Sequence, residues 1–213
     1  MSAFDDRVYH LCRWICWEYF RWYHRLHVYG LEHVPRSGPC ILASNHVSAL
    51  DPPLVGVAIN FRKVHFLAKA ELFRPPWGRW LQRLGAVPVE RGRGDVSALR
   101  RALQLLEEGH LLVLFPEGTR SLNGRLQPAK PGVGLLVLRA RVAVVPAFLD
   151  GSLAALPKGS FWPRPCRLTV RYGSPILPEE LDGLPRDRVG YEQAAQRVMD
   201  RIAALAQPSD DQP

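Results

Sequence analysis

The apolar run Cys40-Ile41-Leu42-Ala43-Ser44-Asn45 is followed directly by His46 and, five residues later, by Asp51-Pro52-Pro53. A short continuous apolar run is typical of a strand that is buried on both faces. Proline is favoured in the first turn of a helix, so the proline pair predicts that a helix begins here. His46 is therefore expected at the carboxyl end of a buried strand, where the chain turns into a helix.

The rest of the chain repeats this alternation of strand and helix. Apolar or alternating runs predict further strands at 64–68, 86–90, 111–115, 142–148 and 166–172. Helical patterns fall between them, at 76–84, 95–109 and 132–141, and again near the C-terminus. Such alternation predicts an α/β fold, with a mainly parallel, mixed sheet flanked by helices.

The N-terminal segment differs from the rest because residues 4–27 interleave Trp and Tyr with Arg and His. This composition is typical of an amphipathic helix at a membrane–water boundary, although a helix packed on the domain remains an alternative. We therefore expect residues 1–29 to form an interfacial helix and residues 30–206 to form one domain. Its motif-bearing core would span 39–152, and residues 207–213 would be a flexible tail.

The charge of the chain is strongly basic. Lys and Arg number 28 against 20 Asp and Glu, a formal net charge of +8, which favours anionic lipid, phosphorylated small molecules or nucleic acid as partners. The four cysteines have no metal-site or disulfide spacing, which indicates a reducing, cytoplasmic compartment. No apolar run is long enough to span a bilayer, and the start does not resemble a secretory signal.

His46 and Asp51 suggest acid–base chemistry. An imidazole has an ordinary pKa near neutrality, and a carboxylate bound to one ring nitrogen leaves the other free to accept a proton. Asp51 could equally cap the helix that begins at Pro52, and spacing leaves both readings open. The chain has no Gly-x-Ser-x-Gly segment to supply a serine nucleophile. A hydroxyl of the substrate itself would then be the attacking group.

A second polar segment, Glu117-Gly118-Thr119-Arg120, follows the apolar run 111–115. Glycine lets a backbone approach an anion closely, and the arginine fork grips phosphate. Three further cations that follow predicted strands or turns could join the same anion site: Lys69, Arg91 and Lys130. The alternative for each is an ordinary solvated surface position.

Four blocks of the sequence resemble the glycerolipid acyltransferases typified by 1-acyl-sn-glycerol-3-phosphate acyltransferase. The first is Asn-His-x-x-x-x-Asp, and the third, Phe-Pro-Glu-Gly-Thr-Arg-Ser, is matched in full. Between and after them come a glycine with an apolar run to an arginine, and an apolar run ending at a proline. In order, the four blocks are Asn45–Asp51, Gly85–Arg91, Phe115–Ser121 and Val144–Ala147.

The resemblance implies transfer of a fatty acyl group from acyl-CoA or acyl carrier protein to the free hydroxyl of a lysophospholipid. The expected acceptor is 1-acyl-sn-glycerol 3-phosphate and the product phosphatidic acid. His46 would be the base and Asp51 its orienting partner, with no metal or other cofactor. The resemblance places the remaining candidates around the substrate phosphate: Glu117, Gly118, Thr119, Arg120, Arg91, Lys69 and Lys130. Ala129 stands before Lys130 where the family often has phenylalanine, and Pro88 and Glu90 stand where apolar residues are common.

The enzyme would lie on the cytoplasmic face of the membrane, as a peripheral or monotopic protein at an anionic surface, without a nucleic-acid partner. Two alternatives stay open. One is a related acyltransferase acting on lyso-ornithine lipid, glycerol 3-phosphate or a lysophospholipid in remodelling. The other is a basic membrane-binding protein without catalysis.

Overall fold

The computed structural model describes residues 3–76, 78–89 and 96–206. The helices are α1 (Ala3–Tyr23), α2 (Asp51–Val57), α3 (Gly78–Arg83), α4 (Val96–Glu107), α5 (Pro131–Ala140), α6 (Ser152–Ala155) and α7 (Arg188–Ala204). Three 3₁₀ turns are η1 (Leu31–His33), η2 (Ala70–Phe73) and η3 (Pro178–Leu181). The strands are β1 (His27–Tyr29), β2 (Cys40–Ser44), β3 (Val64–Lys69), β4 (Ala86–Val89), β5 (Leu111–Leu114), β6 (Ala143–Asp150) and β7 (Thr169–Tyr172).

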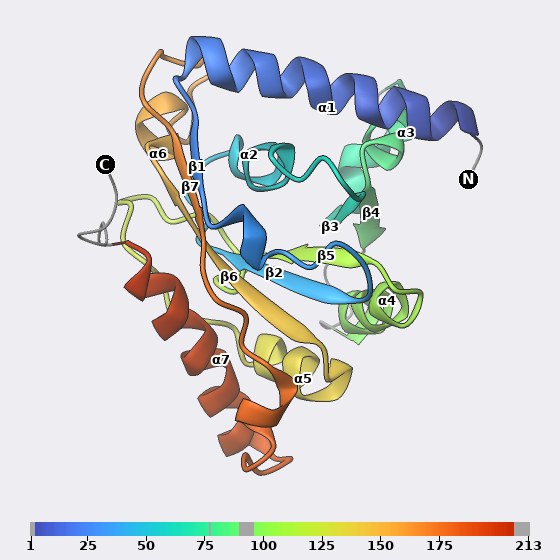
Figure 1. Ribbon diagram of the computed structural model, residues 1–213, viewed down its shortest axis with the longest axis vertical. Coiled ribbons are helices and arrows are strands. Elements are labelled where there is room, and N and C mark those ends of the chain that lie inside the picture. The colour runs from blue at the N-terminus through green and yellow to red at the C-terminus, as the bar shows by residue number, and fades with distance from the viewer. Residues whose placement is uncertain (1–2, 77, 90–95, 207–213) are drawn as a thin grey trace.

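The described strands form one seven-stranded sheet in the order β1-β7-β6-β2-β5-β3-β4. Strands β2 to β6 are parallel to one another, and β7 pairs with β6 in the antiparallel sense. Helices α1 and α2 lie over one face, whereas α4, α5 and α7 lie over the other (Figure 1). The predicted α/β class with a mainly parallel, mixed sheet is confirmed.

Strand β2 shows why its sequence is continuously apolar. Cys40 and Leu42 belong to the core cluster shared with α1 and α2, while Ile41 and Ala43 belong to the cluster shared with α4, α5 and α7. Successive side chains of a strand point to opposite faces, so a central strand covered on both sides has no polar position. All four residues are completely buried.

Helix α1 packs on the sheet through one face. Phe20 is buried in the core, and the backbone N–H of Val64 donates to the hydroxyl of buried Tyr9 (3.1 Å). Arg13 donates from Nη1 to the carbonyl oxygen of Val57 (3.1 Å). The helix is thus held along its length, and none of the described helices is long and apolar enough to cross a bilayer.

The first strand of the sheet lies earlier in the chain than the sequence pattern predicts. Residues 27–29, grouped there with the N-terminal helix, form β1 and pair with β7, Val28 lying opposite Val170. A three-residue edge strand is too short to show a periodic pattern, and its pairing partner lies far along the chain. The expected boundary at residue 29 therefore falls inside the folded domain. The expected helix cap at Asp95 and the tail 207–213 lie outside the described residues.

The register of the parallel strands brings the special segments to one edge. Leu42 pairs with Val113, and Val113 pairs with Phe66. Three residues after these positions, β2 has ended and Asn45 leads into the His46 segment. At the same level, β5 has given way to the turn at Pro116, and β3 ends at Lys69. Ligands bind at this carboxyl edge in open parallel sheets.

Candidate active site

His46 and Asp51 form a direct hydrogen bond. Nδ1 of His46 lies 2.8 Å from Oδ2 of Asp51, whose carboxylate is fully buried. An ionised carboxylate can only accept, so we assign the ring hydrogen to Nδ1 and an unprotonated nitrogen to Nε2. The His46 side chain keeps 17% of its surface exposed, which leaves the ring accessible to a substrate. The pair is therefore arranged as a base with an orienting partner.

Asp51 also holds the turn that connects it to the histidine. Its Oδ2 accepts the backbone N–H groups of Val47 (2.6 Å) and Ser48 (2.7 Å) besides the imidazole. The alternative role, as a cap accepting the N–H of Leu54, does not occur, because that N–H donates to the carbonyl oxygen of Leu50. The carboxylate sits inside the first turn of α2 and faces back toward His46. One side chain thus fixes both the turn and the imidazole.

The segment after β5 holds the backbone of His46 from both sides. Oε1 of Glu117 accepts the N–H of His46 (2.9 Å), and the N–H of Ser121 donates to the carbonyl oxygen of His46 (2.8 Å). The ring of Phe115 stacks on the imidazole, with centroids 4.2 Å apart. Residues 115–121 thus fix both the backbone and the ring of His46.

Glu117 joins two distant parts of the chain. Its second oxygen, Oε2, accepts the backbone N–H of Gln127 (3.1 Å), so both oxygens are used by main-chain donors. Burial raises the pKa of this carboxyl above its ordinary value, while the donors at His46 and Gln127 act in the opposite direction. A buried carboxylate with two such donors is held in one place, as a brace between the β2–α2 turn and the loop before α5.

The anion-binding candidates meet around Gly118. This residue has φ +68°, in the left-handed region that favours glycine, and a Cβ atom there would lie 3.1 Å from Cγ of Lys130. The N–H of Lys130 donates to the carbonyl oxygen of Pro116 (2.9 Å), which ties the start of α5 to the same turn. Arg120 directly precedes Ser121, and its guanidinium has no hydrogen-bond or ion-pair partner among the described residues. Arg120 thus belongs to the segment that holds the backbone of His46, and Lys130 packs over the same turn.

Comparison with known proteins agrees with this geometry. The sequence model of a family described as acyltransferase matches residues 25–150, more than half of the chain. The chain belongs to the acyltransferase family. Its matched region contains both polar segments and the sheet from β1 to β6.

Individual relatives carry more specific names. A chloroplastic 1-acyl-sn-glycerol-3-phosphate acyltransferase of Brassica napus is 36% identical over 143 residues, which covers 65% of the acyltransferase described here and 41% of the relative. An enzyme of the same name from Bacillus subtilis is 32% identical over 125 residues, covering 58% and 62% of the two chains. The acyltransferase thus spans about two fifths of the plant relative's length and about three fifths of the bacterial one's.

A solved structure extends the similarity to nearly the whole chain. The crystal structure of the 1-acyl-sn-glycerophosphate acyltransferase PlsC from Thermotoga maritima superposes with a TM-score of 0.77 at 25% sequence identity. The match covers 97% of this acyltransferase and 83% of that chain. The mixed sheet flanked by helices is therefore the fold of that enzyme.

The structure places most of the predicted site residues at one edge. His46, Asp51 and the turn Glu117–Arg120 are in contact through the bonds described above, and Lys130 packs over that turn. Thr119 is exposed beside Gly118. Lys69 ends β3 at the same level of the sheet, two strands from β2 and exposed. Arg91 lies outside the described residues.

Other contacts of the site had no signal in the sequence. The donors at Ser121 and Gln127 are backbone N–H groups, which almost any residue could supply. The residue types at these two positions therefore do not predict the contacts. Asn45 stands in the first block, and its side-chain amide exchanges two hydrogen bonds with the backbone of Leu149 on β6 (2.7 and 2.9 Å). It therefore fixes the end of β2 against its neighbour.

Glu117→Gln tests the brace. A glutamine has one oxygen and one NH₂ group, so one of the two backbone N–H groups would face another donor. We expect the free energy of unfolding to fall by about 1–3 kcal/mol and kcat for acyl transfer to fall by about tenfold or more. Chemical denaturation and acyl-transfer kinetics measure the two effects. Glu107→Gln, at an exposed position of α4, serves as the control, and equal results for both variants would contradict the brace.

Proposed function

We propose that this protein transfers a fatty acyl group from a thioester donor to the free hydroxyl of 1-acyl-sn-glycerol 3-phosphate, giving phosphatidic acid. The observation that carries the proposal is the hydrogen bond from Nδ1 of His46 to Asp51, joined through Glu117 to the turn that contains Arg120 and that Lys130 packs over. The relatives named 1-acyl-sn-glycerol-3-phosphate acyltransferase support this choice of acceptor. The donor would be acyl-CoA or acyl carrier protein.

The reaction needs two proton transfers, one from the acceptor hydroxyl to His46 and one from His46 to the leaving sulfur. Nε2 of His46 accepts the proton of the acceptor hydroxyl as its oxygen attacks the thioester carbonyl carbon. The new C–O bond forms, the C–S bond breaks, and the imidazolium returns its proton to the leaving sulfur. Asp51 stabilises the positive charge that develops on the ring, as a buried carboxylate does in a serine-protease triad. The oxygen Oδ1 of Asp51 has no hydrogen-bond partner among the described residues, so this negative charge is only partly neutralised.

The acceptor's phosphate gives the neighbouring cations their role. A guanidinium can bind two phosphate oxygens at once, and a lysine adds a point charge. Arg120 would hold the phosphate, with Lys130 beside it and Gly118 allowing close approach of the backbone. Thr119, Lys69 and Arg91 remain candidates for the same anion. Glu117 would shape this pocket indirectly, through the backbone donors that it binds.

Arg120→Ala separates binding from chemistry. We expect KM for lysophosphatidic acid to rise by about 10- to 100-fold with a smaller change in kcat, because a charge-assisted contact to phosphate is lost. Steady-state kinetics on 1-acyl-sn-glycerol 3-phosphate measure this effect. The turnover of 1-acylglycerol, which lacks the phosphate, should stay at the wild-type level. Arg125→Ala, at an exposed position of the same loop, is the matched control. A fall in kcat at unchanged KM would contradict the proposed role.

The activity itself is tested by acceptor-dependent release of thiol from a long-chain acyl-CoA in detergent or vesicles. We expect release with lysophosphatidic acid and formation of phosphatidic acid. Parallel reactions with acyl carrier protein as donor identify the thioester. Parallel acceptors, namely glycerol 3-phosphate, a lyso-ornithine lipid and lysophosphatidylcholine, test the related acyltransferases. No transfer with any donor and acceptor would favour a membrane-binding protein without catalysis.

The location of the enzyme follows from its substrates. Both the acceptor and the product are lipids, and the chain combines a net charge of +8 with an aromatic N-terminal helix. Interfacial helices use Trp, Tyr and Arg at the headgroup boundary, and the cations favour anionic lipid. The proposed site of action is therefore the cytoplasmic face of the membrane, with the protein bound as a peripheral or monotopic enzyme.

A further inference from the structure

Two aromatic side chains stand out from the surface of the domain. Phe161 and Trp162, in the loop between α6 and β7, keep 91% and 83% of their surface exposed. The loop has internal order, since the N–H of Ser160 donates to Pro157 and its hydroxyl donates to the carbonyl oxygen of Trp162 (3.3 Å). Two adjacent large apolar side chains on an ordered loop are unfavourable in water and call for a partner surface.

This aromatic loop starts beside the active site. The hydroxyl of Ser48, in the turn between His46 and Asp51, donates to the carbonyl oxygen of Leu156 (2.9 Å). Further along, the N–H of Arg164 donates back to the carbonyl oxygen of Ala155 (2.8 Å), which closes the loop on α6. The bases of both loops are therefore joined, and Phe161 and Trp162 project from the carboxyl edge of the sheet.

The same loop is joined to the end of α1. The hydroxyl of Tyr23 donates to the carbonyl oxygen of Pro163 (3.0 Å). The sheet register agrees with this, because Asp150 at the end of β6 pairs with Thr169, which pairs with His27, four residues after the end of α1. The C-terminal end of α1 thus lies at the carboxyl edge, next to the aromatic loop.

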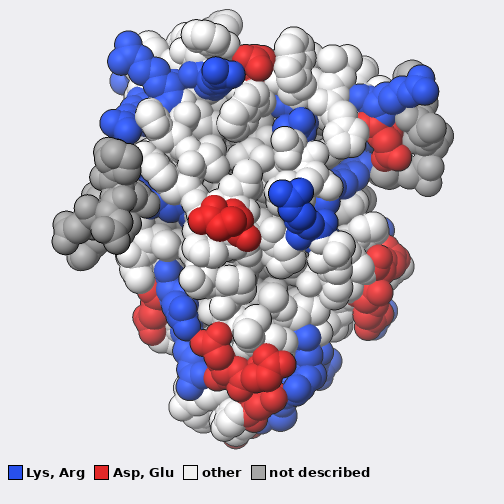
Figure 2. Space-filling model, in the orientation of Figure 1, with Lys and Arg blue, Asp and Glu red and all other residues white. Residues whose placement is uncertain are grey.

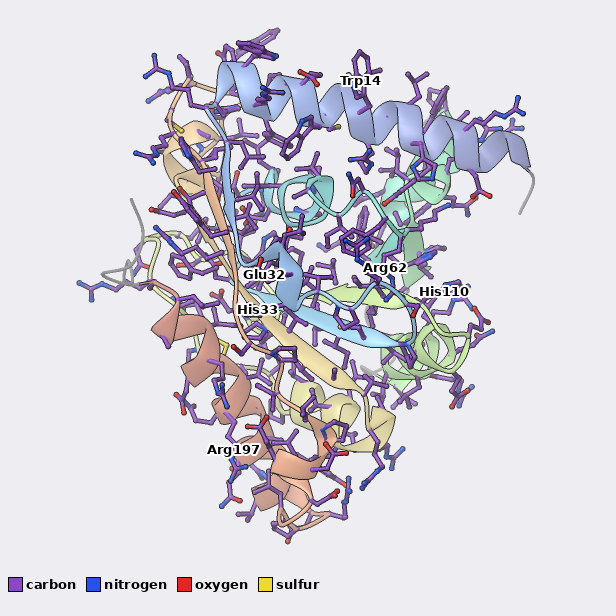
Figure 3. All side chains as sticks on the ribbon, in the orientation of Figure 1. Trp14, Glu32, His33, Arg62, His110 and Arg197 are labelled. Carbon is purple, nitrogen blue, oxygen red and sulfur yellow. The ribbon has the colours of Figure 1, made fainter. Side chains whose placement is uncertain are left out.

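The outer face of α1 continues the apolar surface. Large side chains on this face are exposed at helical spacing, and Trp14 points away from the sheet (Figure 3). These side chains are Leu11, Trp14, Ile15 and Trp22. They lie opposite the face that carries Tyr9 and Phe20 into the core. The exposed apolar face of α1 and the Phe161–Trp162 loop therefore adjoin at the C-terminal end of α1.

Cations lie on the loop and at the C-terminal end of α1. Arg21, Arg25, Lys158, Arg164 and Arg167 are all exposed, and Figure 2 shows Lys and Arg side chains gathered near the C-terminal end of α1. Acidic residues also occur here: Asp5 and Asp6 lie at the far, N-terminal end of α1, and Glu18 and Asp150 lie closer to the loop. Glu18 accepts a hydrogen bond from the indole of Trp22 (2.8 Å), and Asp150 is exposed at the end of β6. The charge therefore complements an anionic surface.

We propose that the Phe161–Trp162 loop inserts into an anionic lipid leaflet as a second contact, together with the outer face of α1. This extends the proposed function, on which it rests for the lipid nature of the substrate. Aromatic side chains anchor in the headgroup region while arginine and lysine pair with lipid phosphates. The Ser48–Leu156 bond then places the His46 turn directly behind the inserted loop. The lipid acceptor reaches the base from the leaflet without leaving it for water.

The test is co-sedimentation of the full chain with vesicles containing phosphatidylglycerol, comparing wild type with Phe161→Ser/Trp162→Ser. The lipid concentration for half-maximal binding should rise by about tenfold or more in the double variant. Val189→Ser removes an exposed apolar side chain from α7, on the opposite face of the sheet, and should bind as the wild type does. Vesicles of phosphatidylcholine alone should bind the wild type more weakly than anionic vesicles do.

Turnover gives an independent measurement. The double variant should lose rate on a long-chain acceptor presented in vesicles, and should keep the wild-type rate on a short-chain, water-soluble lysophosphatidic acid. Unchanged vesicle binding by the double variant would overturn the proposal. Unchanged vesicle binding together with loss of a wild-type dimer would assign the surface to a second copy of the chain. Because vesicle binding needs no turnover, an inactive wild type would refute the proposed reaction and leave this test intact.

Discussion

His46→Ala is expected to reduce acceptor-dependent acyl transfer by about 1,000-fold or more, because the proton acceptor for the attacking hydroxyl is removed. The fold should survive. Asp51 keeps the backbone donors of Val47 and Ser48, and the N–H of residue 46 can still donate to Glu117. Thiol release from acyl-CoA with lysophosphatidic acid measures the loss, and circular dichroism with thermal unfolding checks the fold.

The control for this variant is His110→Ala. His110 precedes β5 at the amino edge of the sheet, at the end opposite to the site (labelled in Figure 3), so its loss should leave kcat unchanged. Vesicle binding should be unchanged in both variants, since neither residue belongs to the apolar surface. If His46→Ala retained even a tenth of the wild-type rate, the imidazole could not be the base.

Asp51→Asn is expected to lower kcat by about 100- to 10,000-fold with little change in the KM of the acceptor. An amide does not stabilise a neighbouring imidazolium as a carboxylate does. Its NH₂ group can also turn the histidine to the tautomer whose free nitrogen faces away from the substrate. Steady-state kinetics with lysophosphatidic acid separate the effect on kcat from that on KM.

The fold should be weakened as well, since the carboxylate accepts two backbone N–H groups besides the imidazole. A loss of about 1–3 kcal/mol in the free energy of unfolding is expected from the weaker hydrogen bonds. Asp182→Asn removes an exposed ion pair with Arg141 and controls for the general effect of a lost carboxylate. A kcat within a few-fold of wild type would mean that Asp51 serves only the turn.

The central strands were predictable because local composition determines them. A run such as residues 111–114 is apolar at every position, which only a strand covered on both faces requires. The opposite edge strand β4 was also predicted, but the edge formed by β1 was not predictable in the same way. Strand β1 is three residues long and exists because β7, from the other end of the chain, supplies its hydrogen bonds. Its pairing is a property of the folded chain.

The site, too, contains residues that the sequence predicted and one role that only the structure shows. The side-chain chemistry of His46, Asp51 and Arg120 made them candidates from the sequence. The resemblance of four blocks to one family pointed to all three. Glu117 was expected in the substrate pocket, and the structure shows its two oxygens bound to the main chain at His46 and Gln127. A carboxylate's residue type does not reveal whether its partner is a substrate or a backbone N–H.

The sequence by itself determined the α/β class, the strand-end position of the two polar segments and the chemical groups available there, because these depend on local patterns and residue types. The tertiary structure alone decided that the Asp51 carboxylate binds the imidazole instead of the N–H of Leu54, that Glu117 braces both loops, and that the loop carrying Phe161 and Trp162 is bound to the end of α1. Each of these facts joins segments through hydrogen bonds with specific geometry. The bonds of Glu117 and Tyr23 form only when the strands are in register and the loops have closed, so no local pattern encodes them.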